Sequence, residues 1–376
     1  MAARAVKTNP LAPEVEQLLS AMDEARALTL ELVAHLSSED LGKVHSPIMS
    51  PLVWDLGHIA AYEDLWIAHR LGGRDLLRAD LAGLYDAFET PRAVRGEIEA
   101  LRPQAAREYM AAVRSHTIET LLREGLDDGV ICEMVLRHEL QHSETMRQTM
   151  ALAGLLPPGE PTLEPMGIAE GWLEIPAGPF EMGADADVFS YDNERARHTA
   201  RTDAFAIGHR PVCNASWMHF SEGGGYERRE WWSAEGWAWK EEYDITHHPD
   251  VAAGHPQAPV CHVSWFEADA FARAHGARLP TEAEWEKAAT WTQGHGGELR
   301  GVGQVWEWTA SPFGGYPGFQ AHPYREYSEV FFGDSYRVLR GASWATHPRV
   351  ASRTFRNWDL PQRRQIFSGV RLARDV

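Results

Sequence analysis

The chain has 376 residues, of which 44% are hydrophobic and 24% charged, which is ordinary for a soluble globular protein and long enough for two domains. Its formal net charge of −18 argues against nucleic acid as a partner, because a phosphate-binding surface must be basic. Only three cysteines occur, without paired spacing, so neither a disulfide framework nor a cysteine-based zinc site is expected.

No apolar run is long enough to span a membrane, so no membrane association is expected. The N-terminal residues 1–7 lack the apolar core of a signal peptide. Together with the few cysteines, this favours a cytoplasmic protein.

Helical periodicity dominates the first part of the chain, residues 1–155, and four long helices joined by short or moderate loops predict a bundle. Ser50 is expected to cap the second helix, with Pro51 at its first position, and Gly154 is expected to end the fourth. The expected helices cover residues 11–36, 51–72, 95–124 and 127–154.

Three histidines are expected on inward faces of these helices. His138 and His142 are four residues apart, so their side chains lie on the same side of one helix. His58 lies on the face of Trp54 and Tyr62 in the second helix. A pair of buried histidines is often purely structural, but polar groups on an apolar face need partners, and three imidazoles suit a first-row metal. We therefore predict a metal site at the three histidines.

The segment 138–142 also matches H-E-x-x-H, the pattern of zinc peptidases, in which Glu139 would be the general base. This pattern is short and occurs by chance. A peptidase would have its third ligand downstream, whereas the best partner here, His58, is upstream on another helix. If the peptidase interpretation is wrong, replacing Glu139 should hardly affect the enzyme's reaction.

Residues 156–170 are rich in proline and lack periodicity, as is typical of a linker. The remaining residues, 171–376, predict a mixed α+β domain with long loops. Helices are expected at 266–275 and from Thr281, with Thr281 and Glu284 as a capping box. Strands are expected at 172–183, 260–265, 304–309, 336–344 and 368–373.

The motifs of both parts resemble a known family. The first part is similar to a DinB-like all-α four-helix bundle with a three-histidine iron site. The second resembles the α+β fold of formylglycine-generating enzymes, which is related to C-type lectins, although no cysteine follows Cys261 to serve as the oxidase cysteine pair. Domain order, motifs and the tail 355–372 resemble the sulfoxide synthases of ergothioneine biosynthesis and the related selenoneine synthases. The motifs of the second part are residues 180–183, 192–195, 278–286, 305–309, 340–344 and 356–358.

This resemblance implies an Fe(II) enzyme that uses O₂ to join sulfur or selenium to the imidazole carbon of hercynine, the trimethylated betaine of histidine. The donor is a thiol, such as γ-glutamylcysteine or cysteine, or a selenosugar. The gap between residues 308 and 340 is short, so the loops leave little surface for clamping a peptide, although sulfur is the commoner chemistry for this architecture. An ovothiol-type synthase acting on histidine is a further alternative.

The resemblance also implies roles for individual residues, with iron held by the first part and substrates by residues of both parts. His58, His138 and His142 would bind the iron, and Tyr324 or, less favoured, Tyr316 would supply a proton. Substrate binding is expected of Gln141, Asn357 and Trp358 for hercynine, and of Asp359, Arg363, Arg92 and Arg95 for the charged ends of the donor.

Overall fold

The computed structural model describes residues 13–167, 171–249, 251–295 and 298–376. The chain divides into two compact units, Met1–Pro158 and Gly159–Val376. The N-terminal segment 1–7, the expected start of the first helix at residues 11–12 and the linker residues 168–170 lie outside the described part. Within that part, no helix combines the length and the apolar character that crossing a membrane requires.

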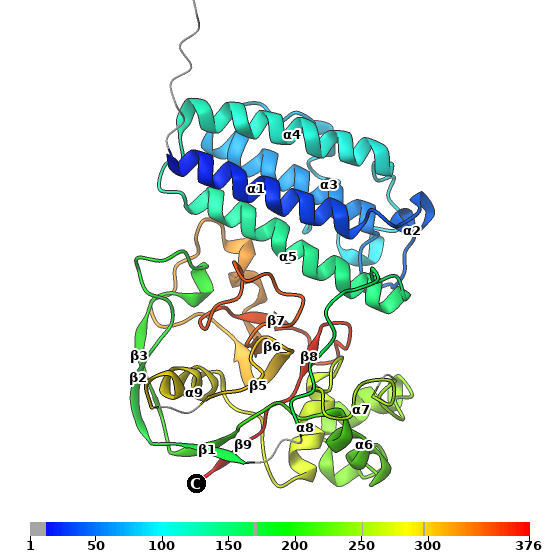
Figure 1. Ribbon diagram of the computed structural model, residues 1–376, viewed down its shortest axis with the longest axis vertical. Coiled ribbons are helices and arrows are strands. Elements are labelled where there is room, and N and C mark those ends of the chain that lie inside the picture. The colour runs from blue at the N-terminus through cyan, green and yellow to red at the C-terminus, as the bar shows by residue number, and fades with distance from the viewer. Residues whose placement is uncertain (1–12, 168–170, 250, 296–297) are drawn as a thin grey trace, which may run out of the picture. The chain divides into compact units, whose positions relative to one another are not determined.

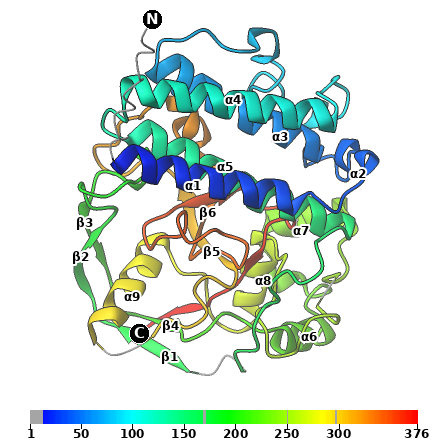
Figure 2. The ribbon, with the colours of Figure 1, turned by 45° about the horizontal axis from the view of Figure 1, so that its top comes forward.

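The first unit is the expected bundle of four long helices, which lie side by side in both views (Figures 1 and 2). The aromatic and aliphatic side chains of α3 form its centre, and every residue from Leu52 to Ala60 is buried. This helix continues without a break into a π-helix, Asp64–Leu71, and ends at Gly72 as expected. The helices of this unit are α1 (Pro13–Leu32), the short α2 (Ser38–Gly42), α3 (Leu52–Glu63), α4 (Pro103–Glu124) and α5 (Val130–Ala153).

Three helix starts differ from the expected positions. The largest difference concerns α4, which begins at Pro103 rather than at residue 95. Proline favours the first helical turn, and the preceding Arg102 is held extended, with φ −64° and ψ 155°. The helices α3 and α5 begin one and three residues late, at Leu52 and Val130. The end of α5 is as expected, since Gly154 adopts φ +67°.

The second unit contains three small sheets, as Figure 1 shows, and is the expected α+β fold. One sheet has the order β1-β4-β9, another is the hairpin β2-β3, and the third has the order β7-β6-β5-β8. Among the strands of the described residues, β5 and β8 pair in parallel and the other pairs are antiparallel. The strands are β1 (Trp172–Ile175), β2 (Gly178–Met182), β3 (His198–Thr202), β4 (Phe205–Gly208), β5 (Trp306–Phe313), β6 (Gly333–Arg340), β7 (Asn357–Asp359), β8 (Ser368–Gly369) and β9 (Ala373–Asp375).

The helices of this unit are α6 (Asn214–Glu222), α7 (Ala234–Glu242), α8 (Trp265–Ala274) and α9 (Glu282–His295). The predicted capping box before α9 is confirmed, because the amide of Glu284 donates to the Thr281 hydroxyl at 3.2 Å and the amide of Thr281 donates to the Glu284 carboxylate at 2.8 Å. The strand expected at 260–265 is wrong. His262 has φ +65°, which interrupts an extended strand, so this segment makes only scattered backbone bonds.

Candidate metal centre

His58 of α3 and His138 and His142 of α5 point toward one another inside the helical unit. One ring nitrogen from each of the three lies within 4.8 Å of the other two. The Nε2 atoms of His58 and His138 are 3.1 Å apart. When two nitrogens each lie about 2.1 Å from the same metal ion and the nitrogen–metal–nitrogen angle is near 90°, the two nitrogens are about 3 Å apart. The spacing of this pair therefore suits a shared metal ion.

The ring of His58 is fixed from two directions. Its Nδ1 lies 2.6 Å from the carbonyl oxygen of Tyr85, which can only accept, so Nδ1 carries the proton and Nε2 keeps its lone pair. Trp54 stacks on the same ring, with centroids 4.7 Å apart. Tyr85 can pack this close to α3 because residue 57 is glycine, since a Cβ at this position would lie 2.1 Å from the Tyr85 ring.

The other two rings have different supports. The Nδ1 of His142 lies 3.0 Å from a carboxylate oxygen of Asp55, so its Nε2 is likewise left to face the cluster. His138 is stacked on Tyr62, with ring centroids 3.7 Å apart and an interplanar angle of 11°.

Burial and the neighbouring His142 hold the pKa values of His58 and His138 well below the ordinary value of 6.5. Both rings are therefore neutral near pH 7 and keep a nitrogen lone pair. A set of imidazole nitrogens fits a divalent first-row metal and leaves further coordination positions for other ligands. The three residues thus fit the metal that the sequence predicts.

Glu139 does not point at this cluster. It is 3% exposed and accepts two hydrogen bonds from Arg26, from Nε at 2.8 Å and from Nη2 at 3.2 Å. Glu63 accepts from the same guanidinium at 2.7 Å. The carboxylate that a zinc peptidase would need as its base is thus part of an ion-pair network in the bundle core.

Arg95, expected to contact the donor, is 6% exposed, and each of its three guanidinium nitrogens donates a hydrogen bond within the helical unit. Its Nε donates to the carbonyl of Thr90 at 2.7 Å, Nη1 to the Ser50 hydroxyl at 2.8 Å and Nη2 to the carbonyl of Ala87 at 3.2 Å. Its guanidinium also lies 3.6 Å from the centroid of the Trp54 ring. This arginine is therefore packed behind the histidine cluster.

Two further residues of the helical unit, Gln141 and Arg92, were expected to bind substrate. Gln141 is half-buried between the two histidines of α5, and Arg92 is exposed in a short 3₁₀ turn, Arg92–Val94. Neither position opposes the substrate-binding role expected of it, and both roles stay predictions.

In the second unit, Asn357, Trp358 and Asp359 form β7 and are half-buried. One face of Trp358 stacks on Phe313 with centroids 4.2 Å apart. Arg363 lies near this strand, and its Nε is 3.8 Å from Asp359 Oδ1. The structure thus brings together four residues expected to bind substrate, three of them on one strand.

The two candidate tyrosines have different environments. Tyr316 is buried and donates a hydrogen bond to Glu282 at 3.1 Å, and burial raises its pKa well above the ordinary value. Tyr324 is half-buried, with its ring centroid 6.2 Å from that of Tyr327. Tyr327 in turn lies edge-on to Trp358 at 5.9 Å. Tyr324 thus approaches the β7 residue Trp358 through Tyr327, whereas the ring of Tyr316 lies 4.1 Å from the guanidinium of Arg356, the residue before β7.

Comparison with known proteins agrees with this architecture. Residues 21–146 match the DinB superfamily, and residues 160–301 and 297–376 match the sulfatase-modifying factor enzyme 1-like domain. The hercynine oxygenase of Mycolicibacterium smegmatis is 40% identical, and the match covers 96% of this chain and 99% of that protein. The hercynine oxygenase of Mycobacterium tuberculosis is 39% identical with the same coverage.

The chain belongs to the hercynine oxygenase family. A shorter match, 40% identical over 77 residues, links 20% of this chain to 9% of ergothioneine biosynthesis protein 1 of Neurospora crassa. The family and the two domain types expected from the sequence are thereby confirmed.

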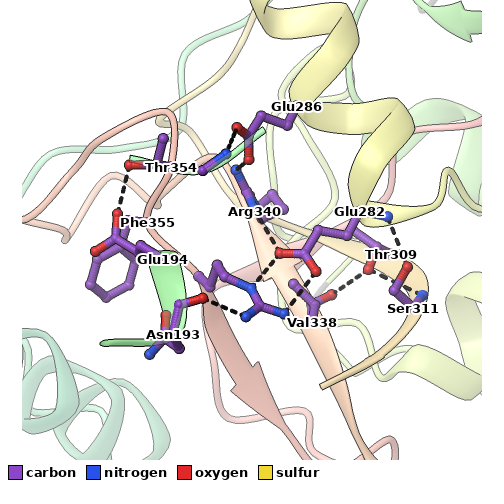
Figure 3. Close-up of polar contacts among 12 residues, drawn as sticks. Asn193, Glu194, Glu282, Glu286, Thr309, Ser311, Val338, Arg340, Thr354 and Phe355 are labelled. Carbon is purple, nitrogen blue, oxygen red and sulfur yellow. Dashed lines mark hydrogen bonds and ion pairs between the residues drawn. The ribbon is translucent and has the colours of Figure 1, made fainter. Parts of the chain in front are cut away.

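Sequence reasoning missed a buried charge network that fixes the start of β7 (Figure 3). Glu282, the first residue of α9, accepts from Arg340 at 2.7 Å and from Arg356 at 2.6 and 2.9 Å. Arg340 also donates to Glu286 at 2.7 Å. All four belong to motifs noted in the sequence, and their opposite charges were the available signal. Asp55, which contacts His142, was also missed, although it lies one helical turn before His58.

Proposed function

We propose that this protein is a non-haem Fe(II), O₂-dependent hercynine oxygenase that forms a carbon–sulfur or carbon–selenium bond on the imidazole carbon of hercynine. The convergence of three histidines in the DinB-like unit carries the proposal, because it supplies an open metal site in a family named for oxygenation of hercynine. The relatives' name favours hercynine over histidine as the acceptor. The link to an ergothioneine biosynthesis protein supports a place in ergothioneine or selenoneine biosynthesis.

In this proposal, His58, His138 and His142 hold the iron through neutral nitrogens. Bound Fe(II) would supply open positions for O₂ and the substrates, which brings the reacting atoms together. Gln141 and Asn357 would orient hercynine by hydrogen bonds. Trp358 would offer the face not covered by Phe313 to the trimethylammonium group, a cation that aromatic rings attract. Tyr324 would hold the proton that the reaction needs.

The donor would be held by Arg363 and Asp359, with Arg92 as a weaker candidate. The contacts of Arg95 within the bundle do not favour a role in a donor clamp. A thiol donor is the commoner chemistry for this architecture, and we propose it first. A selenosugar, which has no α-carboxylate, is the second candidate, because Arg95 is occupied within the bundle and the gap between residues 308 and 340 is short.

The same proposal places the reaction in the cytoplasm. Cys132, Cys213 and Cys261 form no disulfide with one another, which suits a reducing compartment.

The decisive experiment adds Fe(II) and hercynine or histidine to the protein without oxygen. In separate reactions, γ-glutamylcysteine, cysteine or a selenosugar is then added as the donor. O₂ is admitted last, and the product is identified by mass analysis. A coupled product from hercynine, and none from histidine, is expected. Alanine at any of the three clustered histidines should remove both iron and product, whereas His69→Ala, an exposed position in the same unit, should keep both. Full iron occupancy in His58→Ala would contradict the proposal.

A further inference from the structure

Asp55 is a buried carboxylate with only one of its oxygens satisfied by a hydrogen bond. It is 1% exposed on α3. Its Oδ1 accepts from Nδ1 of His142 at 3.0 Å, while Oδ2, also buried, makes no hydrogen bond within the described part of the chain. Leaving a buried charged group partly unsatisfied costs stability. A residue kept at such a cost calls for a role beyond packing.

The charge of Asp55 is balanced by Arg95 without a direct hydrogen bond. The donors of Arg95 go to Thr90, Ser50 and Ala87, and its guanidinium covers Trp54, the residue before Asp55. Burial lowers the pKa of Arg95 to about 10, while the Asp55 carboxylate works to raise it. Arg95 is therefore protonated near pH 7 and supplies a positive charge behind the carboxylate.

The three clustered histidines differ in what holds them. His58 donates to a neutral backbone carbonyl, and His138 rests on the ring of Tyr62. Of these three histidines, His142 is the one that donates to a carboxylate within the described part of the chain. An imidazole that donates to a carboxylate is a stronger electron donor at its other nitrogen and is fixed in one tautomer.

We propose that Asp55 is the positioning residue of the metal centre. It keeps the proton of His142 on Nδ1, presents the Nε2 lone pair to the metal and strengthens that donor, with Arg95 as the buried counter-charge. This inference rests on the proposed function, since it assigns a role toward the iron that His142 would hold.

The bundle contains a matched control for this pair. Asp64, at the start of the π-helix, is 0% exposed and lies 2.8 Å from Nδ1 of His116. This is the same buried carboxylate–imidazole contact in the same unit, but His116 does not belong to the histidine cluster. Asp64→Asn therefore reports the loss of a buried aspartate charge without a change behind the metal.

The test compares Asp55→Asn with Asp64→Asn in the full chain. Co(II), which has visible absorption bands, and Fe(II) are titrated without oxygen, and unfolding of each protein without metal is followed by circular dichroism. The amide of asparagine can donate to His142 Nδ1 and so stabilise the wrong tautomer, as happens when the aspartate of a catalytic triad is replaced. We expect about 10–100-fold weaker metal binding by Asp55→Asn and little change for Asp64→Asn.

A metal affinity of Asp55→Asn within about twofold of that of the unchanged protein would overturn the inference. Equal losses of metal affinity in Asp55→Asn and Asp64→Asn would also overturn it, because they would indicate a general loss of bundle stability. If Asp55→Asn does not fold, Asp55→Glu replaces it. The longer carboxylate should shift the visible Co(II) spectrum, and an unchanged spectrum and affinity would again refute the role. Failure of the unchanged protein to bind either metal would instead reject the proposed function, and this inference with it.

Discussion

Glu139 offers a sharp test of how the bundle uses its buried charges, because Glu139→Gln removes one charge while keeping the side chain's size. Glu139 and Glu63 face Arg26 and Arg114, and all four side chains are less than 10% exposed. Arg26 holds Glu139 by two hydrogen bonds, and Arg114 Nη2 lies 3.7 Å from the same carboxylate. The substitution removes one of the two buried carboxylates that face these arginines, and the third carboxylate of the network, Asp23, which lies 2.6 Å from Arg114, is 64% exposed.

Removing one partner of a buried ion pair costs about 3–5 kcal/mol. Glutamine keeps one acceptor oxygen for Arg26, so we expect the free energy of unfolding of the helical unit to fall by about 3 kcal/mol. Urea unfolding followed by circular dichroism, to which the helices contribute most, measures this loss. Glu119→Gln is the control, because its pair with Arg74 is 65% exposed at the glutamate and worth at most about 1 kcal/mol.

The same variant separates two mechanisms. A peptidase that lost its general base would lose at least about 10²-fold in rate, whereas this hercynine oxygenase homologue should keep its turnover per folded molecule. The sequence alone predicts that replacing Glu139 is nearly silent for the reaction, and the structure adds an expected loss of stability. A free energy of unfolding within about 1 kcal/mol of the control would refute the reasoning about the network.

Tyr324→Phe should lower turnover about tenfold or more, because the reaction would lose its proton donor. Tyr316→Phe should instead lower the free energy of unfolding by about 1 kcal/mol and leave turnover per folded molecule unchanged. Equal losses of turnover in the two variants would contradict this assignment. Arg363→Ala should lower donor kcat/KM about ten- to a hundredfold for a carboxylate-bearing donor, and an unchanged value with every such donor would favour the selenosugar. Acid should destabilise the helical unit: burial acts to raise the pKa of Glu63, but the charges of Arg26 and Arg114 and the hydrogen bonds to this carboxylate together outweigh burial, so the folded pKa lies below 4.5. Stability should hold above about pH 4.5 and fall as pH drops through the lower folded pKa, which thermal unfolding at graded pH measures.

The bundle and its histidine cluster were predictable because both depend on local spacing. A period of 3.6 residues places His138 and His142 on one face of α5 and His58 on the inner face of α3. The end of α5 was also predictable, since Gly154 adopts the left-handed conformation, with positive φ, that other residues adopt only at a cost in free energy. Helix starts were less certain. At α4, the restriction that Pro103 imposes on Arg102 overrode the apparent periodicity before it.

The partners of the buried charges were not predictable in the same way. Asp55 meets His142 across 87 residues, and Arg26 meets Glu139 across 113 residues. Such pairs depend on how the helices are rotated against one another, which hydrophobic periodicity does not fix. The resemblance assigned Arg95 to a charged end of the donor, yet it packs on an aromatic ring and against three oxygen acceptors.

The charged residues that make the second unit recognisable are largely occupied in holding that unit together. Arg371 is fully buried and binds both carboxylate oxygens of Glu307, at 2.6 and 2.7 Å. Arg356 is paired in the same manner. Releasing such a residue to bind substrate would leave a buried charge unpaired, at a cost of about 3–5 kcal/mol. Substrate contacts in this unit are therefore expected from the half-buried neighbours of the motif arginines. Asn357 and Trp358, which directly follow Arg356, meet that condition, because the arginine fixes the strand while their own side chains stay accessible.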